Sequence, residues 1–206
     1  MKKLATLFAM TVVSLGTALA QGTIDFHNPN SFPVTVKDAA GTVTTIGAAG
    51  SPLGPASVRV GLFIGAPGAS FVAMTLVGLA TNSPAGTPLF VGTFNGGTSY
   101  AVPGHANGES VSFAFAAWSI STGALTYTDA LKAPTGYVSF NPVVGNPTVN
   151  PYVLKGGLTL PDATWGTPTA AQPWLVNGLQ LQPVPEPSTI ALGLLGAAAL
   201  LLRRRR

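Results

Sequence analysis

Alternation of apolar and polar positions recurs through the middle of the chain and predicts β-strands with one buried face. The alternation is clearest in two segments, 57–64 and 110–120. Their inward-facing positions are expected to be Val58, Val60, Leu62 and Ile64 in the first segment, and Val111, Phe113, Phe115 and Ala117 in the second. Shorter apolar runs predict further strands at 23–27, 32–37, 42–46, 71–79, 89–94, 125–128, 136–144, 152–160 and 179–181.

Glycine and proline separate these segments. Turns are expected at 66–68, 95–97, 107–108 and 121–123, and longer loops at 142–151 and 161–173. No window shows the helical period over the length that a crossover between parallel strands would need. Many short strands with Gly- and Pro-rich connections therefore predict a mainly β domain, built as an antiparallel β-sandwich or jelly roll.

The N-terminus has the three parts of a secretory signal peptide. Two lysines near the start precede a mostly apolar run over 4–15, and Ala18 and Ala20 supply the small residues that precede a cleavage site. Cleavage by signal peptidase is expected between Ala20 and Gln21. The alternative is a first transmembrane helix, for which the apolar run is short.

The C-terminus combines a polar motif, an apolar helix and a basic end. Pro185-Glu186-Pro187 precedes the apolar helix, and the chain ends on Arg203, Arg204, Arg205 and Arg206. From Ser188 to Leu202 a helix would measure about 22 Å against a hydrocarbon core of about 30 Å. Snorkelling arginines and local thinning of the bilayer compensate for that difference. Because positive charge is retained in the cytoplasm, the arginines are expected to stop transfer and leave the domain outside.

These signals divide the chain into five parts. They are the signal peptide over 1–20, the β-rich extracytoplasmic domain over 21–181, a Pro-rich linker with the motif over 182–188, the transmembrane helix over 189–202, and a basic cytoplasmic stub over 203–206.

The order of motif, helix and basic stub over about 184–206 resembles the PEP-CTERM sorting signal of exported bacterial proteins. This resemblance implies that an exosortase, a membrane-embedded transpeptidase-like enzyme, recognises Pro185, Glu186 and Pro187. It also implies export through the inner membrane, transient anchoring there, and a final place at the cell surface or in an extracellular matrix, with extracellular polysaccharide as a further partner. The alternative is that the two prolines only break the chain before a helix that Ser188 caps.

Charge gives no support for a nucleic-acid partner. The chain has a formal net charge of +4, but two lysines of the signal peptide and the four terminal arginines account for most of its basic residues. Between residues 21 and 184 the charged side chains are Lys37, Arg59, Lys132 and Lys155 against Asp25, Asp38, Glu109, Asp129 and Asp162. No basic patch remains to neutralise phosphates.

Residues that could carry out catalysis are sparse. The chain has no cysteine and only two histidines, His27 and His105. It shows no Gly-x-Ser-x-Gly elbow, His-Glu-x-x-His helix or phosphate-binding glycine loop. We expect no enzyme, no cofactor and no metal. Asp25, Asn28 and Asn30 could offer oxygens to calcium, but an ordinary turn is the preferred interpretation.

Tryptophans raise the question of sugar binding. Trp165 and Trp174 lie in Pro-rich sequence and are the candidates for stacking on a sugar ring, but a role in pinning loops onto the domain is the preferred interpretation. The leading hypothesis is an exported, non-enzymatic surface or extracellular-matrix protein sorted through its tail. The alternatives are a carbohydrate-binding module with the same anchor and a secreted hydrolase whose site is not recognised.

Overall fold

The structure is a computed structural model that describes residues 21–29, 31–82, 91–140, 152–156, 159–165, 175 and 178–184. The expected signal peptide, the loop over 142–151 and the tail from Pro185 onward lie outside these residues. Within the described residues, no helix is long and apolar enough to cross a membrane.

The described part of the chain is built mainly from strands. In chain order the elements are β1 (Gln21–Ile24), β2 (Thr35–Lys37), β3 (Val43–Thr45), β4 (Val58–Gly65), the 3-10 helix η1 (Phe71–Ala73), β5 (Thr75–Thr81), β6 (Tyr100–Ala106), β7 (Ser110–Ser119), the 3-10 helix η3 (Ile120–Thr122), α2 (Tyr127–Ala130), β8 (Tyr137–Phe140), β9 (Tyr152–Val153) and β10 (Gln180–Pro183).

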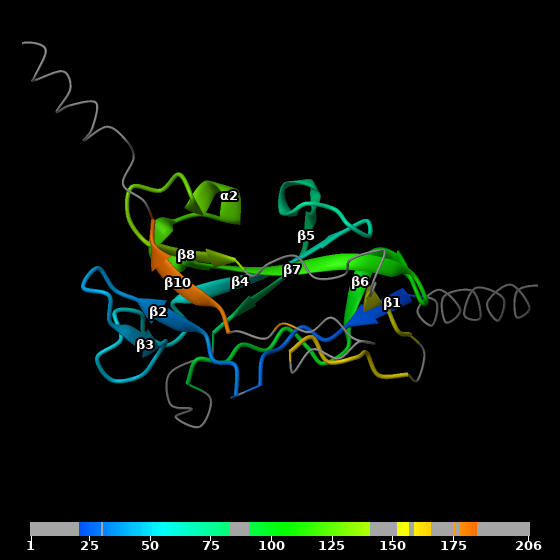
Figure 1. The fold of residues 1–206 in the computed structure, drawn as a ribbon, viewed down its shortest axis with the longest axis horizontal. Coiled ribbons are helices and arrows are strands. Elements are labelled where there is room, and N and C mark those ends of the chain that lie inside the picture. Colours follow the sequence, from blue (N-terminus) through cyan, green and yellow to red (C-terminus); the bar gives the residue numbers. More distant parts are fainter. Residues whose placement is uncertain are drawn as a thin grey trace, which may run out of the picture.

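The strands form one large sheet and one small one (Figure 1). The large sheet has the order β3-β2-β10-β8-β7-β4-β5, with β9 also paired to β7, and β1 pairs with β6 in a two-stranded sheet. The pairs are antiparallel apart from β10 and β2, which are parallel. The prediction of a mainly β domain is confirmed. Among the described strands, only β1 and β6 lie outside the large sheet.

The main core lies on one face of β4 and β7. The register places Leu62 opposite Phe115 and Val60 opposite Ala117, so the two alternating patterns meet side by side. Side chains from β1, β2, β6 and β10 complete this core. The inward-facing positions expected in both strands are confirmed, because period-two alternation puts every second side chain on the same face.

The opposite face of β7 is buried as well. A second core contains Phe63 of β4, Ala116 and Trp118 of β7, and Tyr127 of α2, with Phe71 of η1 packed against it. Its other members are Ala124, Ala130, Val138 and Val184, together with the partly buried Met74 and Leu76. The ring of Phe71 lies 4.9 Å from that of Phe63 and 5.5 Å from that of Tyr127, so η1 and α2 cover this face together.

Two of the segments expected as strands contain a helical turn. The segment 125–128 contains the start of α2, because the extended Thr126 accepts a hydrogen bond from the Asp129 N–H at 3.2 Å and caps the helix. Thr-x-x-Asp is a capping signal that the strand prediction overlooked. The segment 71–79 begins with η1 before β5 starts at Thr75.

Strand β6 was missed in the sequence because of its proline and glycine. It contains Pro103, and Gly104 adopts a φ of 78°. Proline removes one backbone donor from a strand and is tolerated at a sheet edge. Among the described strands β6 pairs only with β1, so its other edge has no strand partner. Pro103 can therefore lie in β6 without removing a hydrogen bond from the sheet.

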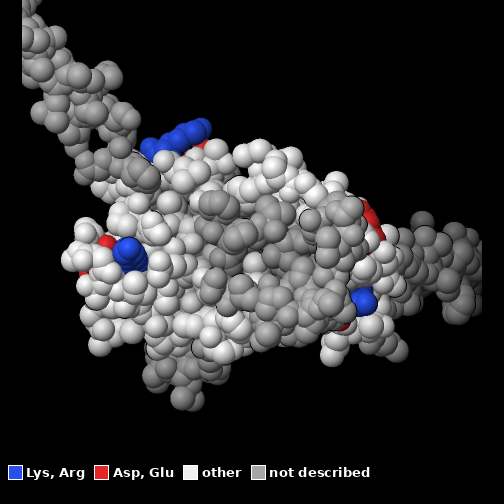
Figure 2. All heavy atoms as spheres, in the orientation of Figure 1, with Lys and Arg blue, Asp and Glu red and all other residues white. Residues whose placement is uncertain are grey.

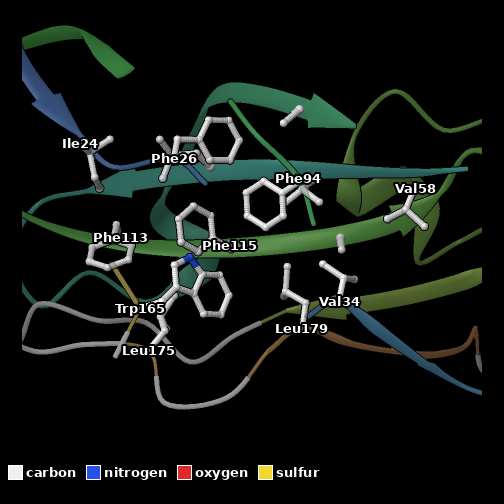
Figure 3. Packing of buried hydrophobic residues seen from close by; sticks show 14 of the residues in the cluster. Ile24, Phe26, Val34, Val58, Phe94, Phe113, Phe115, Trp165, Leu175 and Leu179 are labelled. Carbon is white, nitrogen blue, oxygen red and sulfur yellow. The ribbon is translucent and has the colours of Figure 1, made fainter. Parts of the chain in front are cut away.

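An aromatic stack joins irregular chain to β7. The ring of Phe115 is nearly parallel to those of Phe26 and Trp165, at centroid distances of 5.6 and 5.4 Å, and Figure 3 shows it between them. Phe94 meets Phe115 edge-on at 5.9 Å. Three segments without long strands are therefore held on the main core by one side chain of β7.

Substitution of Phe115 tests this arrangement. We expect Phe115→Ala to lower the free energy of unfolding by about 3–5 kcal/mol, because it leaves a cavity among the three other rings. Denaturant unfolding measures the loss. Leu160→Ala is the control, since this leucine is 75% exposed and should change stability by less than about 0.5 kcal/mol. Should Phe115→Ala not fold, Phe115→Leu gives a smaller loss of the same sign. A loss no larger than that of the control would contradict a central role for Phe115.

Candidate functional site

The described domain ends on β10, which lies inside the large sheet. This strand pairs with β2 through Gln180 and Leu181, and with β8 through Gln182 and Pro183. Leu181 and the preceding Leu179 are fully buried in the main core. A central strand with a buried side is difficult to remove from a sheet, so the chain is fixed up to this point.

The residue after β10 is fixed too. Val184 is only 6% exposed and packs in the second core, on the opposite face from Leu181. Its N–H donates to the carbonyl of Gly136 at 2.9 Å. Gln182, Pro183 and Val184, which were expected in the linker, therefore belong to the folded domain. Prolines at 183 and 185 suggested a linker. Pro183 is nevertheless the last residue of β10 and is paired with Tyr137 of β8.

The structure buries the tryptophan that it describes in the Pro-rich region. Trp165 is 4% exposed, and its ring contacts Phe32, Phe94 and Phe115. The preferred interpretation of Trp165 as a side chain that pins its loop agrees with this burial, and its ring offers no exposed face for a sugar. Trp118 is fully buried, and Trp174 lies outside the described residues.

Asn28 acts as a structural clamp. Its side-chain N–H groups donate to the carbonyls of Phe32 and Gly92 at 2.9 and 3.0 Å, and its Oδ1 accepts from the N–H of Phe94 at 2.6 Å. The oxygen that calcium would need is already in use. Among the described residues no three metal-binding side chains come together, and Asn30 lies outside them. The turn interpretation of this segment is supported by the hydrogen bond from the Phe32 N–H to the carbonyl of Pro29.

Asp25 and His27 form a pair that the sequence did not predict. Nδ1 of His27 lies against Oδ1 of the buried Asp25, while the imidazole remains partly exposed. Burial raises the pKa of the Asp25 carboxyl, and the contacts with His27 and with the Thr164 N–H oppose that rise less strongly. The two residues are two positions apart on extended chain, so their side chains lie on the same face. This i, i+2 spacing was the sequence signal that could have predicted the pair.

His105 and Glu109 form a second pair at the turn between β6 and β7. Glu109 accepts from the N–H of Ala106 at 2.9 Å and lies 2.9 Å from Nδ1 of His105. The backbone hydrogen bond, followed by the one to His105, lowers the pKa of the Glu109 carboxyl. The pair is at the surface and closes the turn.

The two carboxyls should give pH dependences of opposite sign. The raised pKa of Asp25 means that stability falls as pH rises from its ordinary value of 3.8 through the folded value, since the folded state holds the proton more tightly. The lowered pKa of Glu109 gives stability that is present above 4.5 and is lost as pH falls through the folded value.

We expect Asp25→Asn to become more stable relative to the unsubstituted protein as pH rises from 3.8 through the raised folded pKa of Asp25. Glu109→Gln should become less stable relative to the unsubstituted protein as pH rises from the lowered folded pKa of Glu109 to 4.5. Denaturant unfolding of the three proteins at several acid pH values measures both differences. Differences that change in the same direction would contradict the assigned environments.

The comparisons with known proteins match only the C-terminal end. Residues 183–206 match the PEP-CTERM protein-sorting motif. The match begins on the last residue of β10, so the motif follows the folded domain without an intervening spacer. No curated protein and no solved structure matches the chain. The chain is therefore a PEP-CTERM domain-containing protein, with the sorting motif over residues 183–206.

Proposed function

We propose that the chain is a non-enzymatic component of the cell surface or extracellular matrix, sorted by an exosortase. In this proposal Pro185, Glu186 and Pro187 are recognised, the helix over 189–202 holds the protein in the inner membrane, and Arg203 to Arg206 stop transfer. The match of residues 183–206 to a protein-sorting motif is the observation that carries the proposal. A signal peptide over 1–20 would begin the same export route.

The use of polar side chains in the domain supports a structural role. Asn28 clamps a turn, Glu109 closes another, and Arg59 donates from Nη1 to the carbonyl of Ala124 at 2.9 Å. Charged side chains are few and scattered on the face seen in Figure 2. The surface is near neutral, and these polar side chains form hydrogen bonds within the domain. Such a surface suits a structural component of a cell surface or matrix better than an enzyme for a charged substrate.

The structure changes the residues on which the two alternatives rest. A carbohydrate-binding module would have to use a surface other than Trp165, whose faces pack in the core. A hydrolase would have the Asp25–His27 pair as its candidate acid–base group, because a carboxylate that orients an imidazole is a common arrangement in catalysis. Turnover of a substrate that is lost in His27→Ala and kept in His105→Ala would favour this alternative.

Replacement of the motif tests the sorting proposal. We expect Pro185→Ala, Glu186→Ala and Pro187→Ala together to lower the fraction of tail-processed protein by about tenfold or more, as loss of a dominant recognition element does. Mass spectrometry of the protein from an exosortase-containing bacterium measures the fraction. Alanine replacement of Thr167, Pro168 and Thr169 is the control. Unchanged processing in the motif variant would show that the enzyme recognises something else.

A further inference from the structure

Three large apolar side chains project from the cover of the second core. Val72 is 92% exposed, Leu125 is 69% exposed and Leu131 is 45% exposed. Val72 follows Phe71 in η1, while Leu125 and Leu131 lie on either side of α2. We call the surface formed by these three residues the η1–α2 surface.

Local packing explains why these side chains point outward. Phe71 of η1 and Tyr127 of α2 turn inward and meet each other at 5.5 Å, and Ala130 is fully buried. The next residues on such short elements must therefore face solvent. The core does not require Val72, Leu125 or Leu131, and a group of exposed apolar side chains on adjoining segments is typical of an interaction surface.

The C-terminal end of the domain lies on the same side of the sheet. Val184 belongs to the second core together with Tyr127, Ala130 and Val138, and η1 and α2 cover that core. In Figure 1, β10 runs toward the side on which α2 and the segment before β5 stand. The chain thus leaves the domain next to the η1–α2 surface.

The length of the remaining chain restricts the distance to the bilayer. Six residue steps separate Val184 from Ile190, where the apolar run begins, and they span at most about 20 Å when fully extended. The polar headgroup layer takes about 5–7 Å of that distance. If the tail is inserted as proposed above, the side of the domain that carries Val184 has to remain within a few side-chain lengths of the lipid.

We propose that the η1–α2 surface rests on the lipid bilayer that holds the tail, with Val72, Leu125 and Leu131 in the interfacial layer. This inference rests on the proposed insertion of the tail. The tether makes even weak apolar contacts effective, because the lipid is always present at a high local concentration. The exposed charged side chains near α2 are Lys132 and Asp129, of opposite sign, so the contact depends on apolar burial rather than on anionic lipid.

The lack of cysteine permits a direct experiment. Single cysteines at Val72→Cys, Leu125→Cys and Leu131→Cys in the chain from Gln21 to Arg206 can each carry an NBD fluorophore. The protein is reconstituted in phosphatidylcholine vesicles with or without brominated acyl chains. Leu160→Cys is the matched control, since this exposed leucine precedes Asp162, whose carbonyl binds Tyr152 of the main core. Leu195→Cys reports insertion of the tail.

We expect a blue shift and bromine quenching for labels at positions 72, 125, 131 and 195, and neither for a label at 160. Quenching at 195 without quenching at 72, 125 and 131 would overturn the docking and leave tail insertion intact. No quenching at 195 would overturn both. A blue shift that depends on protein density and is not quenched by bromine would indicate a second copy of the chain on this surface and overturn the proposal.

Charged substitutions provide an independent check. Val72→Asp combined with Leu125→Asp should abolish quenching of the label at position 131, because carboxylates remain in water. Leu160→Asp should leave that quenching unchanged. Both substituted sites are exposed, so the fold is retained and near-identical denaturant unfolding confirms it. Undiminished quenching in the double variant would contradict apolar docking.

Discussion

Burial of β7 on both faces is the constraint on which the rest of the structure depends. A strand with one polar face can border solvent, but every residue of β7 after Ser110 is buried. Each face therefore needs its own cover. The main core covers one face with aromatic and aliphatic side chains from distant segments, and the second core covers the other with η1, α2 and Val184.

The two covers explain how a Gly- and Pro-rich chain forms a defined domain. Segments that contain little regular structure contribute single large side chains, such as Phe26, Phe94 and Trp165, which pack around Phe115. Asn28 then satisfies the backbone groups that such segments leave without strand partners. Large aromatic surfaces and one well-placed amide thus replace long strand ladders on this side of the sheet.

The second core also connects the fold to the sorting signal. It fixes Val184 immediately before Pro185, so the Pro-Glu-Pro sequence has the folded domain on one side and the apolar run a few residues away on the other. A sorting enzyme would meet the motif with the domain close above it. The same packing turns Val72, Leu125 and Leu131 outward near the chain exit, which is why we place this surface against lipid.

The sequence by itself determined the parts that depend on local pattern. Alternation in β4 and β7 predicted the main-core positions of Leu62 and Phe115, and the order of motif, apolar run and arginines predicted the sorting tail. Local secondary structure was predicted less well where a capping residue or a proline interrupted the pattern of a strand. Thr126 caps a helix in a segment that was predicted as a strand. Pro103 lies within β6, which was not predicted as a strand.

Only the tertiary structure decided which side chains those patterns leave exposed. Trp165 has the sequence setting of a surface residue, yet its burial depends on Phe115, fifty residues earlier in the chain. Val184 has the setting of a linker residue, yet the second core holds it through Gly136 and Val138. The i, i+2 spacing places Asp25 and His27 on one face, but only the fold decides that the carboxyl of Asp25 is buried. Period and motif are properties of neighbouring residues, whereas burial depends on segments that meet only after folding.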